Sequence, residues 1–182
     1  AYYFVGFLIF EFFATATQTS LTTLKDNSSL LIKSKLPREL FILSRVLTAF
    51  VNFLLGCIPF AAVLAWYRAA VTIYYFMIPV VLLLLLIFTT GMSYLVSIWF
   101  VFQRDARNIY SNFIFILRFF VAMFYSVDWV ADGVKWVIQH NPLYAYIYVM
   151  RQCVVYGRMP EGMYITQMFA WAIGMFGFGI LV

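Results

Sequence analysis

Residues 69–102 form a run of 34 residues without a charged side chain. A helix rises about 1.5 Å per residue, so one helix over this run would be longer than the roughly 30 Å hydrocarbon core of a bilayer. Such a helix must tilt, kink near Pro79 or extend beyond the membrane, and we expect it to protrude on the cytoplasmic side. The run predicts a membrane span.

The composition places the whole chain in the membrane class. Hydrophobic residues make up 65% of the 182 residues and charged residues 10%, against about 45–50% and about 25% in soluble domains. The net charge is +5, but the charges lie in loops and form no basic face with interleaved aromatics, so we expect no nucleic-acid partner. The sequence predicts an all-α, multi-pass integral membrane protein.

A membrane-crossing helix needs about 20 mostly apolar residues, with a range of about 17–25. We expect the stretches that meet or approach this length to form a single transmembrane domain over residues 1–182. Because the chain starts without a methionine and stops inside an apolar run, we also expect it to be part of a longer protein. The five stretches are residues 2–19, 40–66, 69–102, 109–125 and 163–182.

The loops between these stretches differ in positive charge, which sets orientation. If residue 2 starts outside, seven Lys and Arg residues fall on the inner side and four on the outer side. The loop at 20–39 is therefore expected to face the cytoplasm. The inner residues are Lys25, Lys33, Lys35, Arg38, Arg45, Arg104 and Arg107, and the outer residues are Arg68, Lys135, Arg151 and Arg158.

Residues 126–162 are too polar for a span and too apolar for an exposed loop. Asn141-Pro142 divides them, because the residue before a proline is biased away from the helical conformation, and apolar residues recur at helical spacing around it. We expect two short helices that re-enter the outer leaflet, where protein covers their ends. The alternative is a pair of amphipathic helices that lie flat on the outer surface.

No residue pattern in the sequence indicates catalysis or nucleotide binding. His140 is the only histidine, so a two-histidine zinc site is impossible, and the chain has no GxSxG elbow and no phosphate-binding loop. Cys57 and Cys153 lack the spacing of metal ligands. We expect no catalytic residue, metal or cofactor on this chain, so any nucleotide chemistry that powers it must lie on another chain.

Two charged residues lie about halfway along expected spans, Glu11 in residues 2–19 and Arg118 in residues 109–125. Each would cost about 2.5–3.5 kcal/mol at the centre of an isolated span, so each should face protein or water. One interpretation is that they pair with each other or with nearby hydroxyls such as that of Thr15. The other is that Arg118 lines a transport route and meets an anionic phosphate, which its rigid fork of donors suits.

Aromatic residues crowd the expected span at 109–125 on more helical faces than one neighbour could cover. Aromatic rings can stack on sugars or hold lipid tails, although packing against lipid and other helices is the commoner cause. The predicted substrate route consists of Arg118, Tyr110, Phe113, Phe120, Phe124 and Tyr125.

Three motifs follow one another along the chain: KLPREL at 35–40, FQRDARN at 102–108 and NPLYAYIYVMR at 141–151. Together they resemble the permease subunits of ABC-2 exporters for polysaccharides and teichoic acids, and the resemblance covers nearly the whole chain. The stretch VAMFYSVDWV at 121–130 departs from the family pattern, in which a proline commonly precedes the outer region.

The resemblance implies a fold and a set of partners. Such permeases have a six-span core of the type V exporter kind, so residues 2–19 would be the second span and the first would be missing here. They form homodimers and pair with two ABC nucleotide-binding subunits that use ATP and Mg. They export an undecaprenyl-linked glycan or polyol-phosphate polymer across the bacterial cytoplasmic membrane, which makes membrane lipid and the lipid-linked substrate further partners.

The resemblance also implies functional sites. The inner loop would match the coupling helix that fits into the ATPase, the turn at 104–105 would face the same side, and residues 126–162 would match the helices that cap the exit. The implied coupling residues are Leu30, Leu31, Ile32, Lys33, Lys35, Pro37, Arg38, Glu39, Arg104 and Asp105. The implied outer-gate residues are Asn141, Pro142 and Arg151.

Physical arguments that do not depend on the resemblance also support a docking role for this loop. Pro37 suits the start of a helix, and a short helix from Asn27 or Ser28 could present apolar side chains to a groove on a partner. The alternative is that its basic residues serve only orientation and contact with anionic lipid.

Two other functions remain open at this stage. A membrane-embedded transferase acting on lipid-linked sugars could use the outer carboxylates Asp128, Asp132 and Glu161, but these are scattered and belong to no motif. An ABC-2 exporter of small lipophilic cargo would share the fold and differ only in cargo. We expect a transport permease that is not itself an enzyme.

Overall fold

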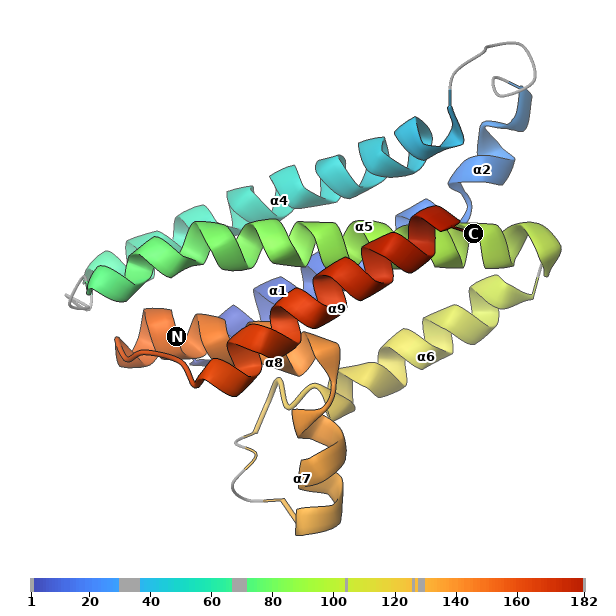
Figure 1. Ribbon diagram of the computed structural model, residues 1–182. Coiled ribbons are helices and arrows are strands. Elements are labelled where there is room, and N and C mark those ends of the chain that lie inside the picture. The colour runs from blue at the N-terminus through green and yellow to red at the C-terminus, as the bar shows by residue number, and fades with distance from the viewer. Residues whose placement is uncertain are drawn as a thin grey trace.

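The computed structural model describes residues 2–29, 37–66, 72–103, 105–125, 127 and 130–181, and all of their regular secondary structure is helical (Figure 1). The chain forms long helices that lie side by side, and its short helices lie at more than one end of this bundle. In chain order the elements are α1 (Tyr2–Leu21), α2 (Thr23–Asp26), α4 (Arg38–Trp66), the 3₁₀ helix η1 (Ile73–Met77), α5 (Ile78–Phe102), α6 (Ala106–Phe120), α7 (Asp132–Gln139), α8 (Pro142–Arg151), the π-helix η3 (Gln152–Tyr156) and α9 (Gly162–Leu181).

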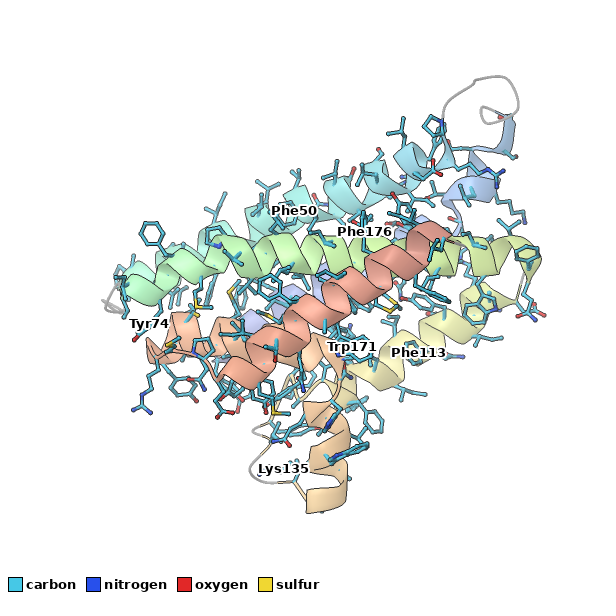
Figure 2. The ribbon with its side chains drawn as sticks, in the orientation of Figure 1. Phe50, Tyr74, Phe113, Lys135, Trp171 and Phe176 are labelled. Atoms are coloured by element: carbon cyan, nitrogen blue, oxygen red, sulfur yellow. The ribbon has the colours of Figure 1, made fainter. Side chains whose placement is uncertain are left out.

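Helix α1 is the centre of the bundle. It packs against α4, α5 and α8, while α9 packs along α5 (Figure 1). In the most apolar 18-residue stretch of each helix, 61% of the residues are buried in α1 but only 17% in α4. Apolar side chains therefore cover much of the outer surface of α4 (Figure 2), as expected of a helix that faces lipid or another protein.

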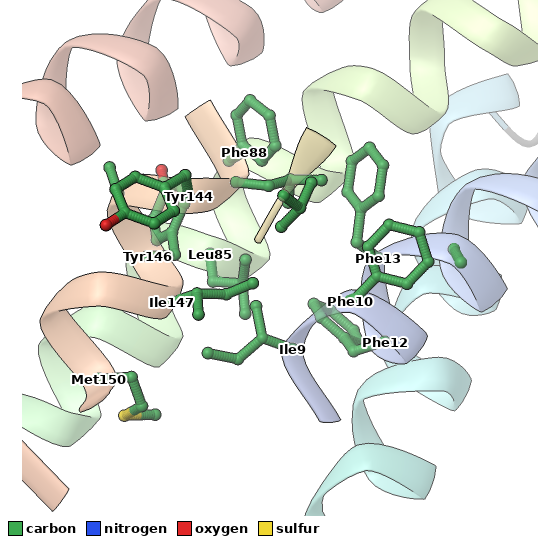
Figure 3. Close-up of a cluster of buried hydrophobic side chains, with 14 of the residues drawn as sticks. Ile9, Phe10, Phe12, Phe13, Leu85, Phe88, Tyr144, Tyr146, Ile147 and Met150 are labelled. Carbon is green, nitrogen blue, oxygen red and sulfur yellow. The ribbon is translucent and has the colours of Figure 1, made fainter. Parts of the chain in front are cut away.

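Aromatic side chains connect the helices of the core (Figure 3). Phe13 of α1 stacks on Phe88 of α5 with ring centroids 5.8 Å apart, and Phe88 meets Tyr146 of α8 at 5.5 Å. The hydroxyl of the fully buried Tyr146 donates a hydrogen bond to the carbonyl of Met168 in α9 at 2.9 Å. A single set of contacts thus ties α1, α5, α8 and α9 together.

Glycines allow α5 and α9 to approach each other at backbone distance. A Cβ on Gly91 would overlap the backbone carbonyl of Met175, and one on Gly179 would lie 2.7 Å from the carbonyl oxygen of Gly91. Small residues at such crossings let transmembrane helices pack closely where no hydrophobic effect drives them together.

Four segments in the described part of the chain are long and apolar enough to cross a membrane: Tyr2–Asp26, Arg38–Trp66, Ile73–Phe102 and Gly162–Leu181. They correspond to four of the five expected stretches. Residues Ile73–Phe102 form one helical segment, in which η1 ends at Met77 and α5 begins at Ile78 with Pro79 in its first turn, where a missing N–H costs nothing. A kink near Pro79, a tilt and a protrusion beyond the membrane stay predictions.

The stretch expected at 109–125 differs from the prediction. Helix α6 begins at Ala106 and ends at Phe120, and its 15 residues give a length of about 22 Å. The chain then turns at Ala122, whose φ of +48° lies in the left-handed region. This helix is amphipathic, and Phe113 projects from its exposed face, away from the bundle (Figure 2).

The expected pair of short helices in the outer region is confirmed as α7 and α8. Asn141 caps α8 with its Oδ1, which accepts from the backbone N–H of Leu143 at 3.0 Å, and Pro142 occupies the first helical position. Eight of the ten residues of α8 are buried, whereas α7 stands away from the bundle (Figure 1). A helix lying flat on a surface would not be covered as α8 is.

Candidate functional site

The helix ends next to the turns expected on the cytoplasmic side lie together at one end of the bundle, which we call the inner end. The end of α1, helix α2, the start of α4, the end of α5 and the start of α6 all lie there (Figure 1). Helix α2 and the start of α4 therefore lie at the same end of the bundle as Asp105, which directly precedes α6. The outer elements α7 and α8 are elsewhere in the molecule.

Exposed charged residues mark this inner end. Arg38 and Glu39 begin α4 directly after Pro37, and all three are exposed, as is Asp105. The backbone N–H of Leu40 donates to the carbonyl of Pro37 at 3.2 Å, so the proline does start the helix as predicted. The other expected coupling residues, Leu30, Leu31, Ile32, Lys33, Lys35 and Arg104, lie outside the described residues.

Contacts between α1, α2 and α5 fix the base of the inner end. Ser97 Oγ of α5 lies 2.7 Å from the carbonyl oxygen of Ser20 in α1 and donates a hydrogen bond there or to Ser93 within its own helix. The ammonium of Lys25 lies 5.6 Å from the centroid of the Phe100 ring, within cation–π range. Helix α2 therefore contacts α5 directly, and α5 in turn contacts α1.

Glu11 and Arg118 form the predicted pair. Arg118 Nη2 lies 3.7 Å from Glu11 Oε2, and Thr15 Oγ1 donates to Glu11 Oε1 at 3.5 Å. The guanidinium also lies 5.3 Å from the centroid of the Phe10 ring. The Arg118 and Glu11 side chains are 36% and 48% exposed, so the pair lies on an open face between α1 and α6.

The six residues of the predicted substrate route differ in how exposed they are. Tyr110 is only 3% exposed because it packs inward from α6, and its place on the substrate route stays a prediction. Phe113, Phe120 and Phe124 are exposed, and Arg118 and Tyr125 are half-buried. The hydroxyl of Tyr125 donates to the carbonyl of Phe119 at 2.6 Å and holds the end of α6.

Arg151 at the end of α8 is buried, with 3% of its surface exposed. Its Nε donates to the carbonyl of Tyr2 at 3.2 Å and its Nη1 to the hydroxyl of Tyr2 at 2.9 Å. Nη1 and Nη2 donate to the carbonyls of Ala122 and Met123 at 3.2 and 3.0 Å. Arg151 is thus a fixed anchor of the outer end, and its expected place at the outer gate stays a prediction.

Two backbone features make room for Arg151. A Cβ on Gly6 of α1 would lie 2.8 Å from Arg151 Nη2, so the glycine admits the guanidinium. The left-handed turn at Ala122 directs two successive carbonyls at the same group, at a cost of about 1–2 kcal/mol for a non-glycine residue. Burial lowers the pKa of Arg151, but a guanidinium stays charged at neutral pH, so these acceptors compensate its lost hydration.

A pocket of about 300 Å³ lies beside this anchor, with walls from α1, α7, α8, η3 and the start of α9. Tyr148 and Tyr164 face each other with ring centroids 4.1 Å apart, and Tyr144 meets Tyr164 at 5.9 Å. The hydroxyl of Tyr148 donates to Glu161 Oε1 at 3.1 Å. Burial, reinforced by Glu161, raises the pKa of Tyr148, so this hydroxyl remains a donor.

Sequence reasoning missed the pocket and the partners of Arg151. Tyr144 and Tyr148 are four residues apart and share a helical face, and this spacing was the one local signal of an aromatic wall. Tyr2, Gly6 and Glu161 come from other parts of the chain, and no local pattern connects them with α8.

These features define a class before any comparison: a multi-pass, all-helical membrane protein with charged turns at one end of its bundle and packed short helices in its outer region. The chain belongs to the ABC-2 type transporter family, whose sequence pattern matches residues 1–155. The membership expected from the three motifs is confirmed.

Two curated relatives from Klebsiella pneumoniae are both described as "O-antigen export system permease protein RfbA". One is 26% identical over 153 residues, which are 84% of this chain and 59% of the relative. The other is 25% identical over 155 residues, which are 85% of this chain and 60% of the relative. The chain therefore spans about three-fifths of the length of the curated relatives it matches.

Proposed function

We propose that this chain is the membrane permease of an ATP-driven exporter that moves a lipid-linked polysaccharide across the bacterial cytoplasmic membrane. Membership of the ABC-2 family supports transport, and the description of both relatives as O-antigen export permeases supports a polysaccharide as cargo. ATP and Mg would be bound by a separate subunit, since the sequence contains no phosphate-binding loop.

The half-exposed pair of Glu11 and Arg118 is the observation that carries the proposal. Ionisable residues within membrane segments face protein or a water-filled cavity, because exposure to lipid is costly. In one protomer this pair is open, so something other than lipid must cover it. A second copy of the chain with a polar conduit at the interface supplies both a partner and water.

Exposed aromatic rings on another face of α6 offer further contacts for the cargo. Phe113 and Phe120 are exposed on α6, and aromatic faces suit sugar rings and isoprenoid tails. Arg118 can donate to a phosphate that links lipid and glycan. The partly exposed guanidinium would also suit a polyol-phosphate polymer, which is the second candidate cargo.

The inner end is the proposed input for the motor. Arg38, Glu39 and Asp105 are exposed there together, and charges at a rim set the register and rate of association with a partner. The loop at 30–36 would supply the apolar contacts of the coupling helix. Two ATPase subunits would then act on a dimer of this chain.

A complementation experiment tests the proposal. A strain that lacks the gene should lose surface polysaccharide and accumulate the lipid-linked polymer inside, and the full-length gene should restore export. Arg118→Gln should reduce export at a normal protein level, with Arg158→Gln, at an exposed outer position, as the control. Normal surface polysaccharide in the deletion strain would refute the export function, and normal export by Arg118→Gln would remove the phosphate contact.

A further inference from the structure

The outer pocket has the size of a small-ligand site. Its volume of about 300 Å³ is at the lower end of the roughly 300–1,000 Å³ that is typical of ligand pockets. It suits one or two sugar rings better than a polymer strand. The pocket lies within one protomer, at residues distinct from the α1–α6 face that carries Glu11 and Arg118.

Aromatic rings form one wall of the pocket. Tyr144 and Tyr164 are 6% and 5% exposed and form its inner part, with Tyr144 at the rim of the buried cluster (Figure 3). Tyr148 is half-buried and presents its ring nearer the opening. A sugar ring has apolar C–H faces that pack on such rings.

Polar side chains also line the pocket. Lys135 and Gln139 line the pocket from α7 and, four residues apart, share one helical face; Figure 2 places Lys135 on this projecting helix. Glu161 accepts from Tyr148, and a carboxylate has further lone pairs to accept from a sugar hydroxyl. The hydroxyl groups around a sugar ring need hydrogen-bond partners, and amide and carboxylate groups such as these can supply them.

The pocket offers few free donors for an anion. Lys135 and Glu161 have opposite signs, and four of the five N–H donors of the Arg151 guanidinium are engaged by Tyr2, Ala122 and Met123. Arg151 keeps its charge, so two cations and one carboxylate give the described lining residues a formal charge of +1, but few free N–H groups are left to hold a phosphate. The same contacts hold Arg151 in place, and a fixed site loses less conformational entropy on binding.

We propose that this pocket binds one neutral hexopyranose unit of the exported polymer at the outer end of the permease. The proposal rests on the proposed export function, since it identifies the ligand with a part of the cargo. By holding a sugar unit that has already crossed the membrane, the pocket would hinder backward movement of the polymer between cycles of ATP hydrolysis.

Binding of free sugars to the full-length permease, purified with its ATPase subunit in lipid nanodiscs, tests the proposal. The probes are maltotriose and mannotriose as neutral sugars and trigalacturonate as an anionic one, followed by saturation-transfer NMR. At least one neutral probe should bind more tightly than trigalacturonate. Tyr148→Ala should weaken that binding about tenfold, as expected from the loss of an aromatic face.

Matched variants distinguish the contribution of the Tyr148 ring to binding from that of its hydroxyl and from effects on folding. Tyr148→Phe keeps the ring and should weaken binding less than Tyr148→Ala. Phe76→Ala changes an aromatic residue outside the pocket that is 86% exposed and should leave binding unchanged. If Tyr148→Ala does not fold, Gln139→Ala replaces it and should also weaken binding.

Three results would overturn the proposal: no binding of either neutral sugar, tighter binding of trigalacturonate, or unchanged neutral-sugar binding in Tyr148→Ala or its substitute. Export measured in cells keeps this outcome apart from the proposed function. A permease that exports polysaccharide without binding these sugars retains its function and loses the pocket assignment. Sugar binding by a permease that exports no polysaccharide would remove the transport function, and with it the identification of the ligand as cargo.

Discussion

The inner and outer ends of the molecule use arginine in opposite ways. At the inner end, Arg38 and Glu39 are exposed at the start of α4. At the outer end, Arg151 is 3% exposed and donates to Tyr2, Ala122 and Met123. The difference shows that a solvent-exposed charge is available to bind a partner, whereas a buried charge with several hydrogen-bond acceptors stabilises the fold.

The largest expected effect comes from breaking the outer anchor. Arg151→Gln would leave buried carbonyls without their charged donor, and we expect a loss of about 3 kcal/mol in the free energy of unfolding. Arg158→Gln changes an exposed arginine seven residues away and should change stability by less than about 0.5 kcal/mol. Thermal unfolding of the purified full-length protein measures both, and equal losses would show that Arg151 is not an anchor.

A smaller effect is expected from narrowing the space that Arg151 occupies. Gly6→Ala places a Cβ 2.8 Å from Arg151 Nη2, and this overpacking should cost about 1–2 kcal/mol. The matched control is Gly174→Ala in α9, where a Cβ meets nothing within 4 Å. The same unfolding measurement compares the two, and a Gly6→Ala protein as stable as the control would contradict the tight seat of the guanidinium.

The pair between α1 and α6 should contribute less still. Because Arg118 and Glu11 are partly exposed and 3.7 Å apart, we expect a coupling energy of about 0.2–1 kcal/mol. A double-mutant cycle with Glu11→Gln and Arg118→Gln measures it. A coupling of several kcal/mol would mean that the pair is buried in the assembled transporter and acts as scaffold, as Arg151 does.

The smallest effect on stability is expected at the inner end. Arg38→Gln and Glu39→Gln together should leave the free energy of unfolding within about 0.5 kcal/mol of the original, because both side chains are exposed. The pair of changes should nevertheless weaken co-purification with the ATPase subunit. Unchanged co-purification would show that these charges do not contribute to binding of the ATPase subunit and serve orientation alone.

Much of the fold could be predicted from the sequence because length and hydropathy decide it. The stretch at 40–66 became α4 (Arg38–Trp66), and Pro79 lies in the first turn of α5, where a proline without an N–H is tolerated. The pairing of Glu11 with Arg118 followed from their matching depth. Each of these inferences needed only a local pattern or one simple distance along a helix.

The rest depends on contacts between distant parts of the chain. Helix α6 ends at Phe120 without a glycine or proline to signal it, and the turn at Ala122 is held by Arg151, which lies 29 residues further on. Tyr2 and Arg151 are 149 residues apart. No local pattern identifies such partners, so the outer anchor and its pocket required the structure.

Site-specific photocrosslinking in cells tests the division between the two ends most directly. A crosslinking residue at Leu31, in the connection between α2 and α4, is compared with one at Trp136, which is exposed on α7. We expect a crosslink to the ATPase subunit from position 31 and none from position 136. A crosslink from position 136, or none from position 31 in a correctly inserted protein, would contradict the assignment of the inner end to the motor.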